Sequence, residues 1–189
     1  VILATFLGDF INYEIELDIH LTKDNIPVVF HEQSLLRMCG VDLEIEDLTL
    51  KELRNYTLLN TNENIPTLKE VLELVNGKTP LIIELKIKST NISLCLYVQA
   101  LLKDYKGLYC IESFNPLALL WYRKHYPNVI RGQLSTAFLK EGNDNPVIWN
   151  FLLQNLLFNF IAKPDFISFN HKTPKLLSLS LCRGLYKTP

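Results

Sequence analysis

Acidic residues and a histidine recur in the stretch 14–32 at spacings that could hold a metal ion. Glu16 and Asp18 lie two residues apart, and the apolar run Pro27–Phe30 leads directly to His31. Side chains two residues apart leave a strand on the same face, so the two carboxylates would repel each other unless a cation lay between them. Such a pair is more often a solvated face of an edge strand, but here the opposite face is wholly apolar. The stretch therefore predicts a hard-cation site served by an acid–base histidine.

Two extended runs and a turn would position these residues. Ile15, Leu17 and Ile19 alternate with polar side chains, which is the pattern of a strand. The turn falls at 23–25, where Asp and Asn tolerate the left-handed backbone that tight turns need. In a simple hairpin, Asp18 would lie opposite His31 with β-carbons roughly 4.5–5.5 Å apart. In a parallel barrel, the second run would instead begin a neighbouring strand, and the sequence pattern leaves both arrangements open.

A second strand repeats this logic at Leu81–Lys86. Glu84 and Lys86 share a face near its carboxyl end, which is where α/β barrels carry their chemistry. Such a pair is often a cross-strand ion pair, but beside Glu16 and Asp18 it supplies a third carboxylate and a lysine. Three carboxylates suit a divalent cation, and the lysine suits an anionic substrate, for which phosphate is our expectation.

Other candidate residues carry weaker signals. Phe114 ends another expected strand, where it would either wall the pocket or pack in the core. His20, His125 and His171 are weaker acid–base candidates than His31.

Strands and helices alternate along the rest of the chain, which favours a parallel sheet with helices packed outside it. Two Thr-x-x-Glu capping boxes, at Thr49 and Thr67, mark helix starts. Residues 2–10 have helical spacing and read as the tail of a helix, and 33–47 reads as a loop. We expect further strands at 80–86, 108–114, 129–134 and 165–170, and further helices at 91–103, 116–126, 146–161 and 174–183.

Composition narrows the class of protein. For 189 residues, with 48% hydrophobic and 21% charged, we expect one domain with a large core, 1–189. The net charge of −1 gives no excess of basic residues of the kind that binds nucleic acid. The four cysteines have no metal-binding spacing and read as reduced core thiols. Because the sequence begins with Val, a preceding signal or membrane segment stays open, and we expect a cytoplasmic or membrane-associated protein.

One strongly apolar run, Val147–Ala162, has two interpretations. It is about a turn short of a membrane span and contains several amide side chains. It is either a helix that packs on the barrel or a helix that faces a membrane, which allows a peripheral membrane contact.

Several of these segments together resemble the glycerophosphodiester phosphodiesterases, whose superfamily also holds the bacterial phosphatidylinositol phospholipases. They follow that family's order and spacing and span nearly the whole chain. Each segment alone is a weak signal, and the set is specific. The matching segments are IELDIHLTKDNIPVVFHE (15–32), EDLTLKEL (46–53), IPTLKEVLEL (65–74), LIIELK (81–86) and ESFNP (112–116).

The resemblance implies a (β/α)8 TIM barrel that hydrolyses a small-molecule glycerophosphodiester to glycerol 3-phosphate and an alcohol. It implies one divalent cation, Mg²⁺ or Ca²⁺, held by Glu16, Asp18 and Glu84. His31 would be one of two acid–base histidines, and Lys86 would contact the phosphate.

Three departures from the family pattern shape these expectations. The family's first strand carries a His-Arg-Gly motif and its last a Trp-Thr-Val-type motif, and neither occurs here. Glu32 follows the histidine where the family usually has Asp. We therefore expect a barrel lacking its first and last strands, with a domain incomplete at both ends. The fragment alone would be inactive and the full-length protein active.

Two other functions remain open at this stage. One is a lipid-directed phospholipase or sphingomyelinase D-like activity from the same superfamily. The other is a non-catalytic barrel that binds glycerophosphodiesters or membranes. The head group, the choice of metal and the oligomeric state are not specified by the sequence.

Overall fold

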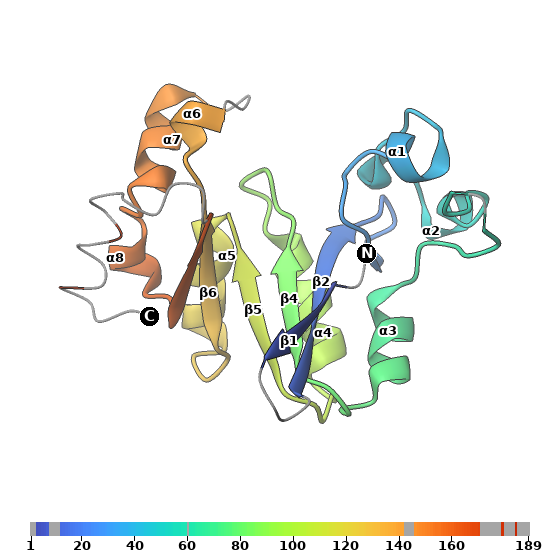
Figure 1. Ribbon diagram of the computed structural model, residues 1–189, viewed down its shortest axis with the longest axis horizontal. Coiled ribbons are helices and arrows are strands. Elements are labelled where there is room, and N and C mark those ends of the chain that lie inside the picture. Colours follow the sequence, from blue (N-terminus) through green and yellow to red (C-terminus); the bar gives the residue numbers. More distant parts are fainter. Residues whose placement is uncertain are drawn as a thin grey trace. The chain divides into compact units, whose positions relative to one another are not determined.

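Strand β2 (Asn12–Leu21) organises the first of two units into which this computed structural model divides, Val1–Tyr109 and Cys110–Pro189. The structure describes residues 3–7, 12–59, 61–141, 146–170, 179 and 184. Strand β2 pairs in parallel with β4 (Leu81–Leu85) and antiparallel with β1 (Leu3–Leu7) and β3 (Pro27–Val29) (Figure 1). The predicted strand and its neighbour at 80–86 are both present.

The turn after β2 makes a true hairpin. Asn25 has the left-handed conformation, with φ of 63°, as the turn chemistry predicts. The register pairs His20 with Val28, and the Phe30 amide donates to the Asp18 carbonyl at 2.9 Å. Phe30 rather than His31 therefore faces Asp18, so the expected hairpin register is wrong by one residue.

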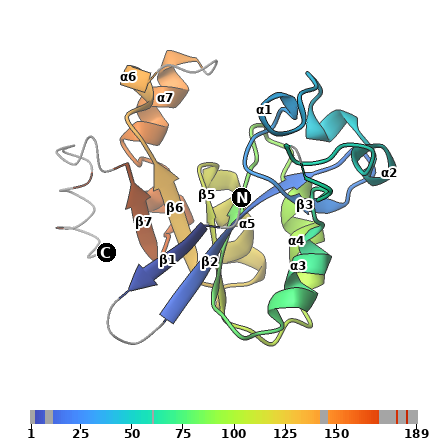
Figure 2. The ribbon, with the colours of Figure 1, turned by 45° about the vertical axis from the view of Figure 1, so that its right-hand side comes forward.

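The helix expected at residues 2–10 is wrong, because residues 3–7 form strand β1. This strand pairs with β2 from Leu7 opposite Asn12 to Leu3 opposite Glu16 (Figure 2). Strand β2 is ten residues long, whereas β4 pairs with only its Ile15–Ile19 portion. A long strand has backbone groups left to satisfy, and pairing with a second segment satisfies them.

The segment between β3 and β4 builds the core of the first unit. The expected loop at 33–47 contains two short helices, and both predicted capping boxes are formed, at Thr49 and Thr67. A cluster of buried apolar side chains closes this region: Val28, Phe30, Leu35, Ile45, Leu53 and Ile65. The helices here are α1 (Leu36–Cys39), the 3-10 helix η1 (Ile45–Asp47), α2 (Leu50–Leu53) and α3 (Leu68–Val75), and α4 (Ser93–Leu102) follows β4.

The second unit is a parallel sheet of β5 (Tyr109–Ser113), β6 (Arg131–Ser135) and β7 (Phe166–Phe169). Gly132 of β6 lies opposite Phe166 of β7. A β-carbon at position 132 would lie 2.2 Å from the Phe166 ring, so only glycine admits that ring. The helices are α5 (Pro116–His125), α6 (Phe138–Glu141), α7 (Val147–Gln154) and α8 (Asn159–Ala162).

The single helix expected over 146–161 is wrong, because α7 and α8 are separate helices. The helical conformation is interrupted at Leu156, whose φ is 56°, and an L-residue in that left-handed conformation cannot continue a helix. No helix within the described residues has both the length and the apolar character to cross a membrane. The helix expected at 174–183 lies outside the described residues.

Within the described residues, Cys39, Cys95 and Cys110 form no disulfide, and the expected core position holds only for Cys95, because Cys39 and Cys110 are half-buried. Burial raises the pKa of the Cys95 thiol to about 12. Cys182 lies outside the described residues.

Candidate functional site

Three carboxylates meet where β2 and β4 run side by side. The parallel register places Asp18 of β2 opposite Glu84 of β4. Glu16 lies two residues before Asp18 on the same face of β2. One oxygen from each of the three side chains lies within 4.8 Å of the others. The structure thus brings together the acidic residues that the sequence singled out.

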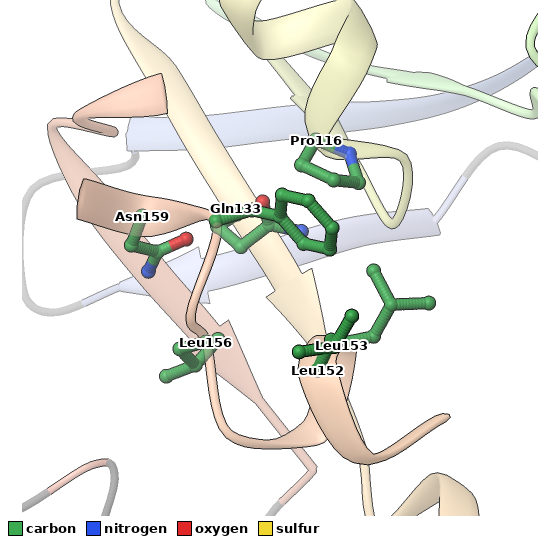
Figure 3. Close-up of a pocket in the computed structure, with 7 residues that line it drawn as sticks. Pro116, Gln133, Leu152, Leu153, Leu156 and Asn159 are labelled. Atoms are coloured by element: carbon green, nitrogen blue, oxygen red, sulfur yellow. The ribbon is translucent and has the colours of Figure 1, made fainter. Parts of the chain in front are cut away.

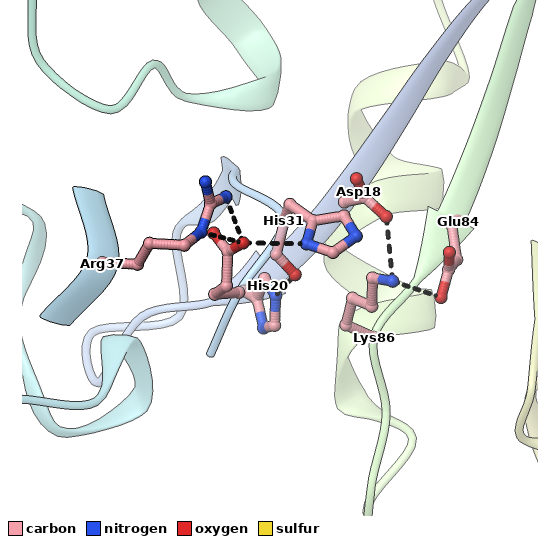
Figure 4. Close-up of polar contacts among 7 residues, drawn as sticks. Asp18, His20, His31, Arg37, Glu84 and Lys86 are labelled. Carbon is pink, nitrogen blue, oxygen red and sulfur yellow. Dashed lines mark hydrogen bonds and ion pairs between the residues drawn. The ribbon is translucent and has the colours of Figure 1, made fainter. Parts of the chain in front are cut away.

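Lys86 completes this cluster from the end of β4. Its amide donates to the Ile19 carbonyl at 3.0 Å, which fixes the backbone beside β2. Its ammonium Nζ lies 2.9 Å from Asp18 Oδ1 and 2.7 Å from Glu84 Oε1 (Figure 4). A positive charge therefore already lies between two of the carboxylates.

Burial makes the electrostatics of the cluster strong. Asp18 and Glu84 are only 5% and 4% exposed. Burial raises the pKa of Glu84 to about 7, although Lys86 acts in the opposite direction. Burial alone would lower the pKa of Lys86, but the charge of Glu84 and hydrogen bonds to both carboxylates raise it instead. Buried carboxylates that need a cation, with oxygen as the only donor atom, fit a hard ion such as Mg²⁺ or Ca²⁺.

His31 directly follows Phe30, which pairs with Asp18, and its ring contacts Glu32. Its Nδ1 lies 3.2 Å from Glu32 Oε1, and the ring is 57% exposed. The same oxygen accepts from Arg37 Nε at 2.7 Å and from Arg37 Nη2 (Figure 4). These hydrogen bonds outweigh partial burial and lower the pKa of Glu32.

Arg37 is the residue of this site that sequence reasoning missed. It lies on α1, in a stretch expected to be a loop, five positions after Glu32. Neither the strand pattern nor the carboxylate spacing refers to it. The sequence shows only a basic residue a few positions after the acidic residue that follows His31. Such pairs are common on protein surfaces and do not by themselves indicate a site.

The remaining sequence candidates separate into different environments. His20 is buried on β2, and burial lowers its pKa to about 4, so its ring is neutral near pH 7. Phe114 lies in the second unit, is 38% exposed and meets Phe138 edge-on at 5.9 Å. Its role as a pocket wall stays a prediction. His125 is exposed at the end of α5, and His171 lies outside the described residues.

Comparison with protein families gives one match across most of the chain. The model of the glycerophosphoryl diester phosphodiesterase family matches residues 13–179. A glycerophosphodiester phosphodiesterase of Caldanaerobacter subterraneus is 30% identical over 138 residues, covering 67% of this chain and 56% of the relative. The human lysophospholipase D GDPD1 is 31% identical over 155 residues, covering 76% and 43%. The chain thus spans less than two thirds of the length of these relatives.

Solved structures give the same result for the fold. An Oleispira antarctica phosphodiesterase, solved with the product sn-glycerol 3-phosphate, has a TM-score of 0.65 and 25% identity, covering 82% of this chain and 62% of that one. A glycerophosphodiester phosphodiesterase of Thermotoga maritima has a TM-score of 0.63 and 24% identity, covering 91% and 67%. The predicted α/β class and the TIM-barrel family of folds are confirmed.

Proposed function

Because the chain belongs to the glycerophosphoryl diester phosphodiesterase family, we propose that the full-length protein hydrolyses glycerophosphodiesters to sn-glycerol 3-phosphate and an alcohol. The observation that carries this proposal is the cluster of Glu16, Asp18 and Glu84 with Lys86 between two of them. A purely structural ion pair would need one carboxylate, whereas three meet here and two of them are buried. Hydrolysis of a phosphodiester needs positive charge at the phosphoryl group, and these carboxylates can hold a cation that supplies it.

One divalent cation, Mg²⁺ or Ca²⁺, is held by Glu16, Asp18 and Glu84 in this proposal. When bound, the ion polarises the phosphoryl oxygens and lowers the pKa of an attacking hydroxyl group. The oxygen donors and their mutual distance of at most 4.8 Å support this assignment.

Lys86 contacts the substrate phosphate. The Lys86 side chain is 21% exposed, so its ammonium can reach a ligand while staying beside Asp18 and Glu84. A charged hydrogen bond from Nζ to a phosphate oxygen offsets part of the substrate's negative charge.

His31 acts as one acid–base group. The Nδ1–H of His31 donates a hydrogen bond to Glu32, which leaves Nε2 to exchange a proton with the substrate. Arg37 fixes Glu32 in turn, so Glu32 and Arg37 are positioning residues for the imidazole. This arrangement holds one tautomer of His31 without any contact between Arg37 and the substrate.

The test is hydrolysis of glycerophosphocholine by the full-length protein. We expect EDTA to stop the release of sn-glycerol 3-phosphate and added Mg²⁺ or Ca²⁺ to restore it. His31→Ala should lower kcat by about 10²–10⁴-fold with little effect on metal affinity. A matched loss of metal affinity would make His31 a ligand, and no hydrolysis with any metal would favour a non-catalytic binding barrel.

A lipid-directed activity is the second candidate, and the human relative named a lysophospholipase D favours it. Lysophosphatidylcholine or sphingomyelin would replace the glycerophosphodiester as substrate, with the same metal and phosphate residues. A panel of these lipids beside glycerophosphocholine separates the two, because the better substrate has the higher kcat/KM.

A further inference from the structure

Helices α7 and α8 of the second unit bury polar side chains and expose apolar ones. Their buried polar side chains are the amides Asn150, Gln154 and Asn159, at 5%, 9% and 8% exposure. Their most exposed side chains are apolar: Val147, Ile148 and Phe160 are 74%, 67% and 68% exposed. A helix on a water-facing surface has the opposite pattern.

Exposed apolar side chains occur on one face of α7 and on α8. Val147, Ile148 and Phe151 occupy positions i, i+1 and i+4 of α7, which share one helix face. Phe160 and Ile161 are adjacent on α8, and both are at least half exposed. We call these five residues the α7–α8 apolar surface.

Hydrogen bonds on the inner side fix this orientation. Ser135 Oγ donates to the Leu153 carbonyl at 3.3 Å, and Gln154 Oε1 accepts from the Leu139 amide at 3.1 Å. A small pocket beside α7 is lined in part by Pro116, Gln133 and Asn159 (Figure 3). Turning the apolar side inward would break these two hydrogen bonds.

Positive charge lies beside α8, and the sequence from 146 to 164 contains no Asp or Glu. Asp165 follows this range and pairs with Arg131. Lys163 directly follows α8 and is exposed. Arg123, in the last turn of α5, donates a hydrogen bond to the Ile161 carbonyl, which brings that basic turn to α8. Lys124 lies beside it and is exposed. Arg123, Lys124 and Lys163 form the basic rim of the surface.

We propose that the α7–α8 apolar surface docks on the interface of an anionic phospholipid bilayer. Its apolar side chains enter the acyl boundary while the basic rim meets the lipid phosphates. Trp149 stacks on Phe158 at 5.6 Å between ring centroids, and aromatic rings favour this boundary. A second copy fits less well, because a symmetric dimer would bring the basic rim against its own copy. This contact is independent of the proposed hydrolysis.

Co-sedimentation of the full-length protein with vesicles tests the apolar side chains. We expect binding to vesicles of phosphatidylcholine mixed with phosphatidylglycerol, weaker binding to phosphatidylcholine alone, and loss at high salt. The double variant Ile148→Asn/Phe160→Asn should lose at least about tenfold in vesicle affinity. The control Leu74→Asn removes a residue that is 74% exposed on α3 and should bind normally.

A charge variant tests the basic rim. Lys124→Glu/Lys163→Glu should lose about tenfold or more on the anionic vesicles, whereas Lys78→Glu in the first unit should not. Circular dichroism checks folding, and hydrolysis of glycerophosphocholine should be unchanged in all variants. The proposal is overturned by equal vesicle binding of wild type and apolar variant, or by no binding at all. It is equally overturned by a dimer in sedimentation velocity that the apolar variant dissociates.

Discussion

At the scale of single residues, the site depends on carboxylates that the fold forces close together. Asp18 and Glu84 face each other because their strands pair in parallel register. Their burial makes the pair unfavourable without a neighbouring cation, and Lys86 supplies one in this structure. A divalent ion would compete with Lys86 for the same oxygens, which ties metal binding to the position of the lysine.

Glu84→Gln removes one of the proposed metal ligands while keeping the shape of the side chain. We expect metal affinity to fall by more than the roughly 10–100-fold typical of a lost outer partner. Isothermal titration calorimetry with Mg²⁺ and Ca²⁺ measures it. Glu73→Gln, an exposed change on α3, is the control, and unchanged metal affinity in Glu84→Gln would remove that residue from the ligand set.

Glu32→Gln removes the charge that joins His31 to Arg37. Because the imidazole then loses its charged partner, kcat should fall by about tenfold while KM changes little. Glu32→Asp should recover part of the rate, since it keeps the charge. Steady-state kinetics measure both constants, with Glu63→Gln as a control. A rise in KM of about tenfold with unchanged kcat would instead place Glu32 in substrate binding.

At the scale of elements, sequence signals and structure agree best at helix ends, where unpaired backbone groups need capping residues. Helix α3 begins at Thr67, whose hydroxyl accepts from the Glu70 amide while Glu70 bonds back to the Thr67 amide at 2.7 Å. The helix ends at Asn76 in the left-handed conformation. Both ends could be predicted from sequence because capping depends on residues a few positions apart.

Thr67→Ala should lower the free energy of unfolding by about 1 kcal/mol, because the Glu70 amide at the start of α3 loses its partner. Urea denaturation of the full-length protein measures the change. Thr90→Ala, an exposed position, should leave stability within about 0.5 kcal/mol of wild type. A similar loss in both variants would contradict the capping role.

Gly132→Ala tests the contact between β6 and β7. The added methyl group would overlap the Phe166 ring, so the free energy of unfolding should fall by about 1–3 kcal/mol. The double variant Gly132→Ala/Phe166→Leu should recover part of the loss by removing the ring. No loss in the single variant would mean that the ring moves freely.

At the scale of the whole molecule, the chain belongs to its family although it spans less than two thirds of the curated relatives it matches. Its inactivity as residues 1–189 alone stays a prediction. A turnover assay on that chain beside the full-length protein tests it.

Metal binding should also appear as stability of the whole protein. At about 100 times the dissociation constant, a bound ion adds about 2.7 kcal/mol, which corresponds to a rise in Tm of roughly 5–10 °C. Thermal melts with EDTA and with added Mg²⁺ or Ca²⁺ measure this, and Asp18→Asn should lose the rise. A rise of the same size in Asp18→Asn would place the stabilising ion elsewhere.

The amino-acid sequence by itself determined the strand–helix alternation, the capping boxes and the spacing of Glu16 and Asp18. These depend on residues near one another in the chain, where periodicity and turn chemistry operate. Only the tertiary structure decided the hairpin register, the pairing of residues 3–7 with β2, the contact of Arg37 with Glu32 and the outward apolar face of α7. Each of these depends on how segments pack against one another, because burial and hydrogen bonding override local preference once strands and helices pack.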